Sequence, residues 1–309
     1  MKIKIIDLFA GVGGFHMAFH NLGAKCVFAS EIDKYARMTY EHNLKKIDPE
    51  MFKKDMFKGD IQKIIPEDIP DFDVLCAGFP CQPFSQIGYK RGFQDEQANR
   101  GNMFFEIVKI LKAKRPKAFF LENVRHLLNH EGGRTFATIK ETLEKSGYSF
   151  QHKMVKASDY GLPQHRPRLF MVGFKDESTA ETSFVFPEKI PLKLTMSDIF
   201  KGDCDREIWY TLRVGGRGSR IDDRRNWEFY WVNKKVKRVG IEEGKKMQGF
   251  PEDFEFPVSE IQAMKQLGNS VAVPAIQAVA SNIIKYLRSE LSEGRNLFSP
   301  AGRKELAKA

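Results

Sequence analysis

The chain has 309 residues, a formal net charge of +10 and 42% hydrophobic residues, which allow one large domain, or a large and a small one, around a substantial core. No run of 18 apolar residues and no cleavable signal pattern is seen, and the four cysteines lack paired spacing, so we expect a cytoplasmic protein without a membrane span or structural metal. The basic balance favours a polyanionic partner.

Strands and helices alternate in the first part of the chain. Strands are expected at residues 2–10, 24–31, 72–78, 117–124, 148–155 and 168–174. Helices are expected at residues 15–23, 33–44, 102–115, 135–147 and 272–291. This alternation predicts an α/β fold, with a mostly parallel, doubly wound sheet and helices on both faces. From residue 176 to about 240 the pattern gives way to Gly, Arg, Asp and aromatic residues, which indicates a small, loop-rich insertion.

The first strand and helix are joined by DLFAGVGGF, whose glycines let a backbone approach a ligand at a helix N-terminus. These glycines are Gly11, Gly13 and Gly14. Glu31 ends the second strand, where an acid suits ribose hydroxyls. Asp60, before the apolar Ile61, could hold an adenine amino group, although a turn or helix cap is the simpler interpretation. Together these residues predict an adenosine cofactor, without distinguishing NAD from S-adenosylmethionine.

A thiol and an acid follow two further apolar strands. Cys81 lies between two prolines in GFPCQPFS, at the carboxyl end of a strand, where open α/β folds bind ligands. Cys76, within that strand, is interpreted as a small buried core residue. Glu122 ends the FFLENV strand, and a carboxylate there is costly to desolvate unless it has a function. Arg166 and Arg168, two residues apart at the start of a strand, are expected to share one face and to grip an anion or a carboxylate.

In this order, these segments resemble the motifs of the C5-cytosine DNA methyltransferases of bacterial restriction–modification systems. The matching segments are DLFAGVGGF, GFPCQPFS, RGNMFFEIVKIL, FFLENV, YGLPQHRPRLFMVGF and KQLGNSVAVPAIQAV. The resemblance implies a Rossmann-like methyltransferase fold, S-adenosyl-L-methionine as cofactor and double-stranded DNA as partner. It implies a catalytic and cofactor-binding domain of residues 1–175 and 241–309, and a small target-recognition domain of residues 176–240. A monomer is expected because the mechanism needs no second subunit.

The resemblance also implies a mechanism in which the target cytosine leaves the duplex. The Cys81 thiolate adds to C6 while Glu122 holds the ring at N3, and a methyl group passes from S-adenosylmethionine to C5. Arg168 orients Glu122 and the base, and Arg166 contacts the base or a phosphate. The implied cofactor-binding residues are Phe9, Gly11, Gly13, Gly14, Glu31, Ile32, Asp60, Ile61, Gly78, Pro80, Met103 and Asn269.

The DNA-reading residues are expected in the basic part of the chain. Residues 206–240 contain ten Lys/Arg and four Asp/Glu, and so carry +6 of the net charge. Arginines there can pair with guanine in the major groove, although some must hold phosphates and a solvated charged face remains the alternative. The loop at residues 85–101 is interpreted as a lid over DNA. The implied DNA-binding residues are Gln82, Ser85, Lys90, Arg91, Thr211, Arg213, Arg217, Arg220, Arg224 and Arg225.

Four other functions are alternatives to this interpretation. An RNA cytosine methyltransferase on the same scaffold should carry a CFT tripeptide, which is absent. A silent DNA-binding relative should lack one of the catalytic residues. A nicotinamide dehydrogenase would not explain the thiol and acid motifs, and a hydrolase using Cys81 would need His165 as its partner.

Two histidine pairs have the helical i, i+4 spacing of metal ligands. They are His16 with His20 and His126 with His130. Neither pair has a third candidate ligand nearby in the sequence, so we interpret all four as ordinary histidines on helix surfaces.

Overall fold

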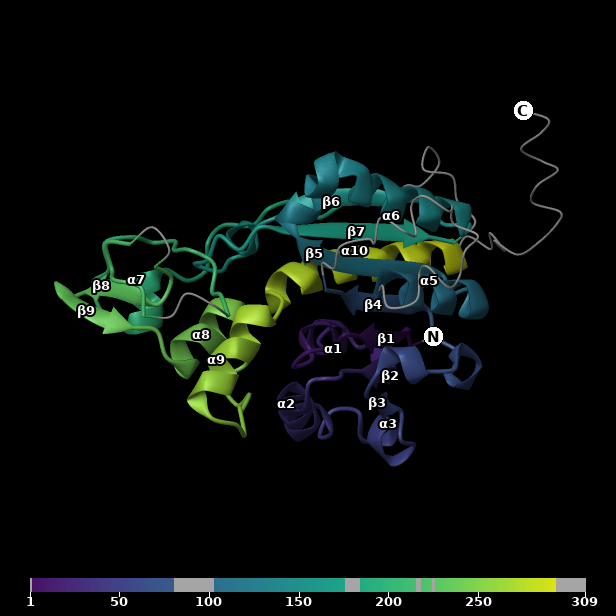
Figure 1. The fold of residues 1–309 in the computed structure, drawn as a ribbon, viewed down its shortest axis with the longest axis horizontal. Helices are drawn as coiled ribbons and strands as arrows, with labels where there is room; N and C mark the ends of the chain where they lie inside the picture. The colour runs from purple at the N-terminus through teal and green to yellow at the C-terminus, as the bar shows by residue number, and fades with distance from the viewer. Residues whose placement is uncertain (1, 81–102, 176–183, 215–217, 224–225, 293–309) are drawn as a thin grey trace.

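A seven-stranded sheet forms the body of the molecule (Figure 1). The computed structural model describes residues 2–80, 103–175, 184–214, 218–223 and 226–292. The strands are β1 (Lys4–Leu8), β2 (Lys25–Ser30), β3 (Phe57–Lys58), β4 (Val74–Gly78), β5 (Ala118–Val124), β6 (Gln151–Val155) and β7 (Arg168–Phe174), in the order β3-β2-β1-β4-β5-β7-β6. Only β7 runs against its neighbours, which confirms the predicted mostly parallel sheet.

The central strands are apolar on both faces, as strands covered by helices on two sides must be. Successive residues of a strand point to opposite faces, so neighbouring side chains enter different cores. Ile5 and Phe120 belong to one apolar cluster, whereas Ile6 and Phe119 belong to another. The sheet therefore has a hydrophobic core on each side.

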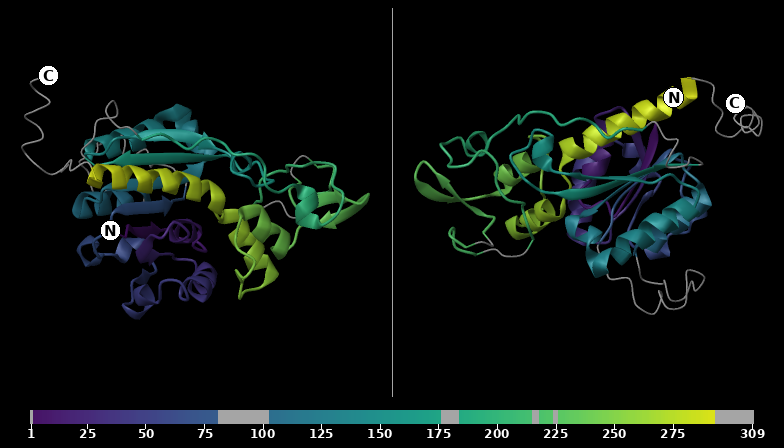
Figure 2. Two further views of the ribbon diagram at one scale, coloured as in Figure 1. Left: turned by 180° about the vertical axis from the view of Figure 1, so that it is seen from behind. Right: turned by 90° about the horizontal axis from the view of Figure 1, so that it is seen from above.

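Helices cover both faces of the sheet, as predicted (Figure 2). One face carries α1 (Gly14–His20) and α10 (Val273–Ser292), and the other carries α5 (Met103–Lys114) and α6 (Arg134–Lys145). Two helices, α2 (Lys34–Leu44) and α3 (Pro49–Lys53), adjoin the β2–β3 edge. Short 3₁₀ turns occur at Ile61–Lys63, Pro66–Asp68, Arg125–Leu128, His130–Gly133 and Ala157–Asp159.

The stretch from residue 260 to 289 is long and apolar enough to cross a membrane by length and composition alone. However, 67% of its most apolar window is buried inside the protein, and α10 packs on α1 against the sheet. The apolar residues of this stretch are therefore explained by their packing in the protein core.

A smaller group of elements lies beyond one end of the sheet (Figures 1 and 2). It contains α7 (Met196–Phe200) and an antiparallel hairpin of β8 (Phe229–Val232) and β9 (Lys235–Arg238). Two helices, α8 (Ile241–Gln248) and α9 (Glu260–Asn269), lie between this group and the sheet. Long irregular stretches separate these elements, in agreement with the loop-rich composition. The exact domain boundaries stay a prediction.

Candidate active site

The ends of five strands bring the predicted site residues to one edge of the sheet. The parallel strands β1, β2, β4 and β5 all end there. Gly78, the last residue of β4, lies opposite Glu122 of β5 in the strand register. Because β7 runs in the opposite direction, its first residue, Arg168, lies at the same edge, opposite Val124.

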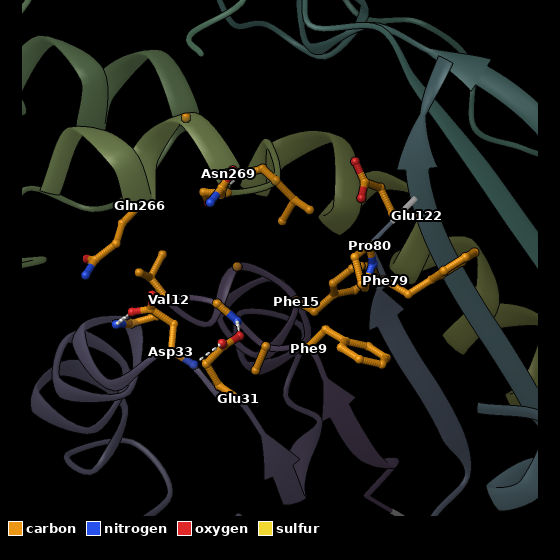
Figure 3. Close-up of a pocket in the computed structure, with 18 of the residues that line it drawn as sticks. Phe9, Val12, Phe15, Glu31, Asp33, Phe79, Pro80, Glu122, Gln266 and Asn269 are labelled. Atoms are coloured by element: carbon orange, nitrogen blue, oxygen red, sulfur yellow. Dashed lines mark hydrogen bonds between the residues drawn. The ribbon is translucent and has the colours of Figure 1, made fainter. Parts of the chain in front are cut away.

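A cavity of about 430 Å³ opens at this edge (Figure 3). Its lining includes the predicted residues Phe9, Gly11, Gly14, Glu31, Ile32, Gly78, Pro80, Glu122, Arg168 and Asn269. Other residues that line the cavity were not predicted from the sequence: Val12, Phe15, Asp33, Ala36, Phe79, Gln262, Lys265, Gln266 and Val271. Four predicted cofactor residues, Gly13, Asp60, Ile61 and Met103, are not part of this lining. Six of the lining residues that were not predicted lie inside the segments DLFAGVGGF, GFPCQPFS and KQLGNSVAVPAIQAV, which were the available signal for them.

The loop after β1 has the backbone shape that its glycines allow. Gly11 and Gly13 have φ angles of 55° and 91°, in the left-handed region that favours glycine. Phe9 shares this conformation with a φ of 54°, although it has a side chain. A Cβ on Gly14 would lie 2.5 Å from Cγ2 of Val271, so this helix start packs tightly on the C-terminal segment. The loop and that segment together form one wall of the cavity.

Glu31 is held by backbone amides on both of its carboxylate oxygens (Figure 3). Oε2 accepts a hydrogen bond from the Gly11 amide at 2.8 Å, and Oε1 accepts one from the Asp33 amide at 2.8 Å. Asp33 in turn caps α2 by accepting from two amides of its first turn. Beside them, Ile32 is 72% exposed and offers an apolar surface at the cavity. This side of the cavity therefore combines the Glu31 carboxylate, held by two amides, with the exposed apolar side chain of Ile32.

Asp60 acts as a cap in this structure. Its Oδ1 accepts a hydrogen bond from the Gln62 amide at 3.0 Å, at the start of a 3₁₀ turn. Ile61 is buried among the apolar residues on the α5 side of the sheet. The observed contact of Asp60 is therefore that of a helix cap, the simpler of the two interpretations. A contact of Asp60 or Ile61 with a cofactor stays a prediction.

Glu122 forms an ion pair with Arg168 at the wall of the cavity. The Arg168 Nε lies 2.9 Å from Glu122 Oε1, and both side chains are largely buried. Burial raises the pKa of the Glu122 carboxyl, whereas the guanidinium groups of Arg168 and Arg166 act to lower it. Asn123, the next residue, donates from Nδ2 to the Phe79 carbonyl at 2.9 Å and so joins β5 to the chain after β4. The Glu122 carboxyl is thus fixed in position, and its pKa is higher than that of an ordinary glutamate.

Arg166 and Arg168 have different hydrogen-bond partners, and their expected shared face stays a prediction. Arg166 precedes β7 and has a φ of 29°. Its guanidinium donates to three backbone carbonyls, those of Leu212, Gly268 and Ser270. Only Arg168 is paired with Glu122 among the described contacts. The buried guanidinium of Arg166 therefore connects Leu212 to the segment of Gly268 and Ser270. Its contact with a base or phosphate stays a prediction.

The remaining predicted residues fall into two groups. Cys81, Gln82, Ser85, Lys90, Arg91, Arg217, Arg224 and Arg225, with the 85–101 loop, lie outside the described residues. Thr211 is half-buried, whereas Arg213 and Arg220 are exposed on the stretch that leads away from the sheet. Arg220 lies 3.3 Å from Asp222, a pair too exposed to hold it rigidly.

The structure corrects the interpretation of His16, which is a core residue and not a surface histidine. It is fully buried, with Nδ1 2.8 Å from the Tyr40 hydroxyl and Nε2 2.9 Å from Asp48 Oδ2. Cys76 is buried as predicted, and burial raises the pKa of its thiol. Within the part of the chain that the structure describes, no three His, Cys, Asp or Glu residues gather as metal ligands would.

The chain is similar to known proteins in both sequence and fold. The family model described as C-5 cytosine-specific DNA methylase matches residues 3–213 and 210–285. The chain is 38% identical to the type II methyltransferase M.DsaV of Dactylococcopsis salina, over 96% of this chain and 90% of that protein. It is 41% identical to M.NgoBI of Neisseria gonorrhoeae, over 89% and 91%. A DNMT2 mutant from Spodoptera frugiperda has a similar fold, with a TM-score of 0.67, 19% identity and coverage of 93% and 99%.

Proposed function

Since the chain belongs to the C-5 cytosine-specific DNA methylases, and is a DNA (cytosine-5-)-methyltransferase, we propose that its cavity binds S-adenosylmethionine and that Cys81 and Glu122 act on a cytosine of duplex DNA. The observation that carries this proposal is the position of Glu122. Its buried ion pair with Arg168 lies in the wall of the same cavity that contains Glu31 and the glycine loop. A single site therefore combines features suited to a nucleoside cofactor with an acid suited to a base.

The residues of the cavity fit S-adenosylmethionine. A volume of about 430 Å³ is within the range of small-molecule sites. Glu31, fixed by two amides, would accept from the ribose hydroxyls, and the exposed face of Ile32 would pack on the adenine. Gly11 has open space where a side chain would otherwise stand, which leaves room beside the loop for the amino-acid part. The bound cofactor would supply an activated methyl group for C5 of the base.

In the proposed reaction, the Cys81 thiolate forms a bond to C6 of the cytosine, and the electron pair of the C5–C6 double bond moves to C5. Glu122 hydrogen-bonds N3 and so stabilises the charge that develops on the ring. Its raised pKa supports this role because a protonated carboxyl can donate to N3. Arg168 holds the other side of the carboxyl. Once C5 has used this electron pair to take up the methyl group, loss of the C5 proton re-forms the C5–C6 double bond and expels the Cys81 thiolate.

The reacting base must leave the helix to reach Cys81 and Glu122, because both sides of its ring are shielded within stacked DNA. We assign sequence reading to the basic stretch that starts at Thr211 and Arg213, with residues 176–240 as the target-recognition domain. The relatives named as type II methyltransferases suggest that this protein is the modification enzyme of a restriction–modification system. Such an enzyme works in the cytoplasm, and one chain carries every residue the reaction needs.

The proposal is tested by incubating the purified protein with plasmid DNA and S-adenosylmethionine and by mapping 5-methylcytosine with conversion sequencing. We expect methylation of one cytosine in one short sequence. The Cys81→Ser variant should lose methylation while binding the same DNA, because the alcohol is a far weaker nucleophile than a thiolate.

Three outcomes would contradict the proposal in different ways. Methylation by the Cys81→Ser variant at the wild-type rate would exclude Cys81 as the nucleophile. DNA binding by the wild-type protein without methylation would favour a silent DNA-binding relative. Methylation of tRNA in place of DNA would overturn the substrate.

A further inference from the structure

A buried glutamine to which the proposed mechanism gives no role, Gln164, connects α8 to the start of the basic stretch. Gln164 is fully buried in the loop before β7. Its Nε2 donates to the Met247 carbonyl at 3.0 Å and lies 3.4 Å from Oε1 of Gln248, both on α8. Its Oε1 accepts from the Leu212 amide at 2.9 Å. The amide of Gln164 thus joins the sheet, α8 and the start of the basic stretch.

Two more buried side chains extend this connection to the cofactor cavity. Gln248 is fully buried, and its Nε2 donates to the Leu267 carbonyl of α9 at 2.6 Å. Arg166 donates to the Leu212 carbonyl at 3.1 Å, to the Gly268 carbonyl at 2.8 Å and to the Ser270 carbonyl. We call Gln164, Arg166 and Gln248 the clasp.

The clasp fixes both backbone groups of Leu212. Its amide is held by Gln164 and its carbonyl by Arg166. Leu212 lies between Thr211 and Arg213, the residues to which we assign DNA contacts. The clasp therefore positions the first residues of the DNA-reading stretch from two sides.

On its other side, the clasp holds a wall of the cofactor cavity. Residues 268–271 line that cavity, and Arg166 binds two of their carbonyls. The backbone of α9 also touches the basic stretch directly, since a Cβ on Gly268 would lie 2.6 Å from the carbonyl carbon of Arg213. No side chain fits between the two segments, so a shift of one must move the other.

The conformation of Arg166 supports a role in positioning. Its φ of 29° is unfavourable for a residue with a side chain, and such backbone persists only where surrounding contacts enforce it. Here the hydrogen bonds to the carbonyls of Leu212, Gly268 and Ser270 hold the residue in this conformation. Its Nε is buried and has no hydrogen-bond partner among the described residues, so the guanidinium is placed by its two terminal nitrogens alone.

We propose that the clasp holds the DNA-reading stretch in register with the cofactor cavity, so that a cytosine delivered by the one reaches the methyl group held in the other. Gln164 and Gln248 act here as positioning residues, because neither lines the cavity. This inference rests on the proposed function. It predicts that loosening the clasp slows methyl transfer in a protein that still folds and binds its cofactor.

The test compares single-turnover methyl transfer by the wild-type protein and the Gln248→Met variant, which keeps the side-chain length but removes the amide. We expect the rate constant to fall roughly ten- to hundred-fold, the penalty for a misplacement of about an ångström. The dissociation constant of S-adenosylhomocysteine should change less than about threefold, because no residue that lines the cavity is altered. Rates are normalised to the concentration of cofactor-binding sites, so misfolded protein does not count.

Ser149→Ala is the matched control. Ser149 is also buried, and its Oγ accepts from the Phe174 amide at 2.9 Å, at the opposite end of β7. This variant loses a buried hydrogen bond without touching the clasp, so its normalised rate should match the wild type. If Gln248→Met does not fold, the shorter Gln248→Asn variant, which keeps an amide, replaces it with the same expectation.

A double-mutant cycle with Gln164→Met gives a second readout. Because the two glutamines contact each other and share the same segments, their effects on the rate constant should not add. A Gln248 variant with the wild-type normalised rate would overturn the clasp, as would strict additivity of the two substitutions. Failure of the wild-type protein to methylate DNA would count against the proposed function instead, so the two failures are distinguishable.

Discussion

Removing Arg168 should destabilise the protein by an amount that depends on pH. In the Arg168→Leu variant, the Glu122 carboxyl keeps its buried position but loses the guanidinium 2.9 Å away. Taking one partner from a buried ion pair costs about 3–5 kcal/mol, because a charge is left without compensation. The carboxyl can escape part of this cost by binding a proton, so its pKa should rise above its already raised wild-type value.

The sign of the pH dependence follows from this shift. Arg168 stabilises only the ionised carboxylate, so its contribution is present at pH values above the pKa of Glu122 and is lost as the pH falls through it. At acidic pH Glu122 is protonated in both proteins, and the difference in unfolding free energy should be small. It should grow as the pH rises through the window between the wild-type pKa and the higher pKa of the variant.

The measurement is urea denaturation of both proteins from pH 5 to pH 8.5. Near pH 8 the variant should unfold about 1 M earlier, for a loss of about 3 kcal/mol and a typical slope of denaturation. Other titrating groups are common to both proteins and cancel in the difference. In a Glu122→Gln background, Arg168→Leu should cost much less and lose its pH dependence. A difference that stays constant across the pH range, or persists in that background, would refute the reasoning.

Three further predictions concern other parts of the molecule. Glu31→Ala leaves two backbone amides without their acceptor and should weaken S-adenosylhomocysteine binding about ten- to hundred-fold by calorimetry, so an unchanged affinity would contradict its role. Gly268→Ala should destabilise the protein by about 1–3 kcal/mol because its Cβ would meet the Arg213 backbone, whereas Gly59→Ala, with no atom within 4 Å of its Cβ, should not. Burial lowers the pKa of His16, so its contribution to stability is lost as the pH falls below about 6.5 toward that lowered pKa. His16→Gln should remove this part of the acid sensitivity in thermal unfolding.

The fold was predictable because its strands and helices are local patterns. The short, continuous apolar runs at β4 and β5 are typical of strands buried on both faces of a sheet, and the alternating helices favour parallel crossovers. Proline and glycine marked several boundaries, such as Pro116 before β5 and Gly23 after α1. The elements in residues 184–240 were not predicted individually, because strands as short as β8 and β9 leave little periodicity to detect.

Part of the candidate site was predictable from residues that stand at the ends of apolar strands. Glu122 and Glu31 follow apolar runs, so their places at the edge of the sheet could be inferred from the pattern alone. Gln266 and Lys265 line the same cavity from α9, more than 140 residues beyond Glu122, and no local pattern, apart from the resemblance of KQLGNSVAVPAIQAV, brings a helix there. Only the tertiary fold places them at the cavity.

The contacts of Arg166 could not be predicted from the sequence. The spacing of Arg166 and Arg168 suggests a shared face, but it does not say which groups each guanidinium meets. Arg166 has a φ of 29°, and its guanidinium donates to carbonyls at the end of α9 that a helix cannot satisfy internally. The two arginines therefore have different contacts. Arg168 pairs with Glu122, the acid of the proposed reaction, whereas Arg166 joins the cavity wall at Gly268 and Ser270 to Leu212, beside the residues to which we assign DNA contacts.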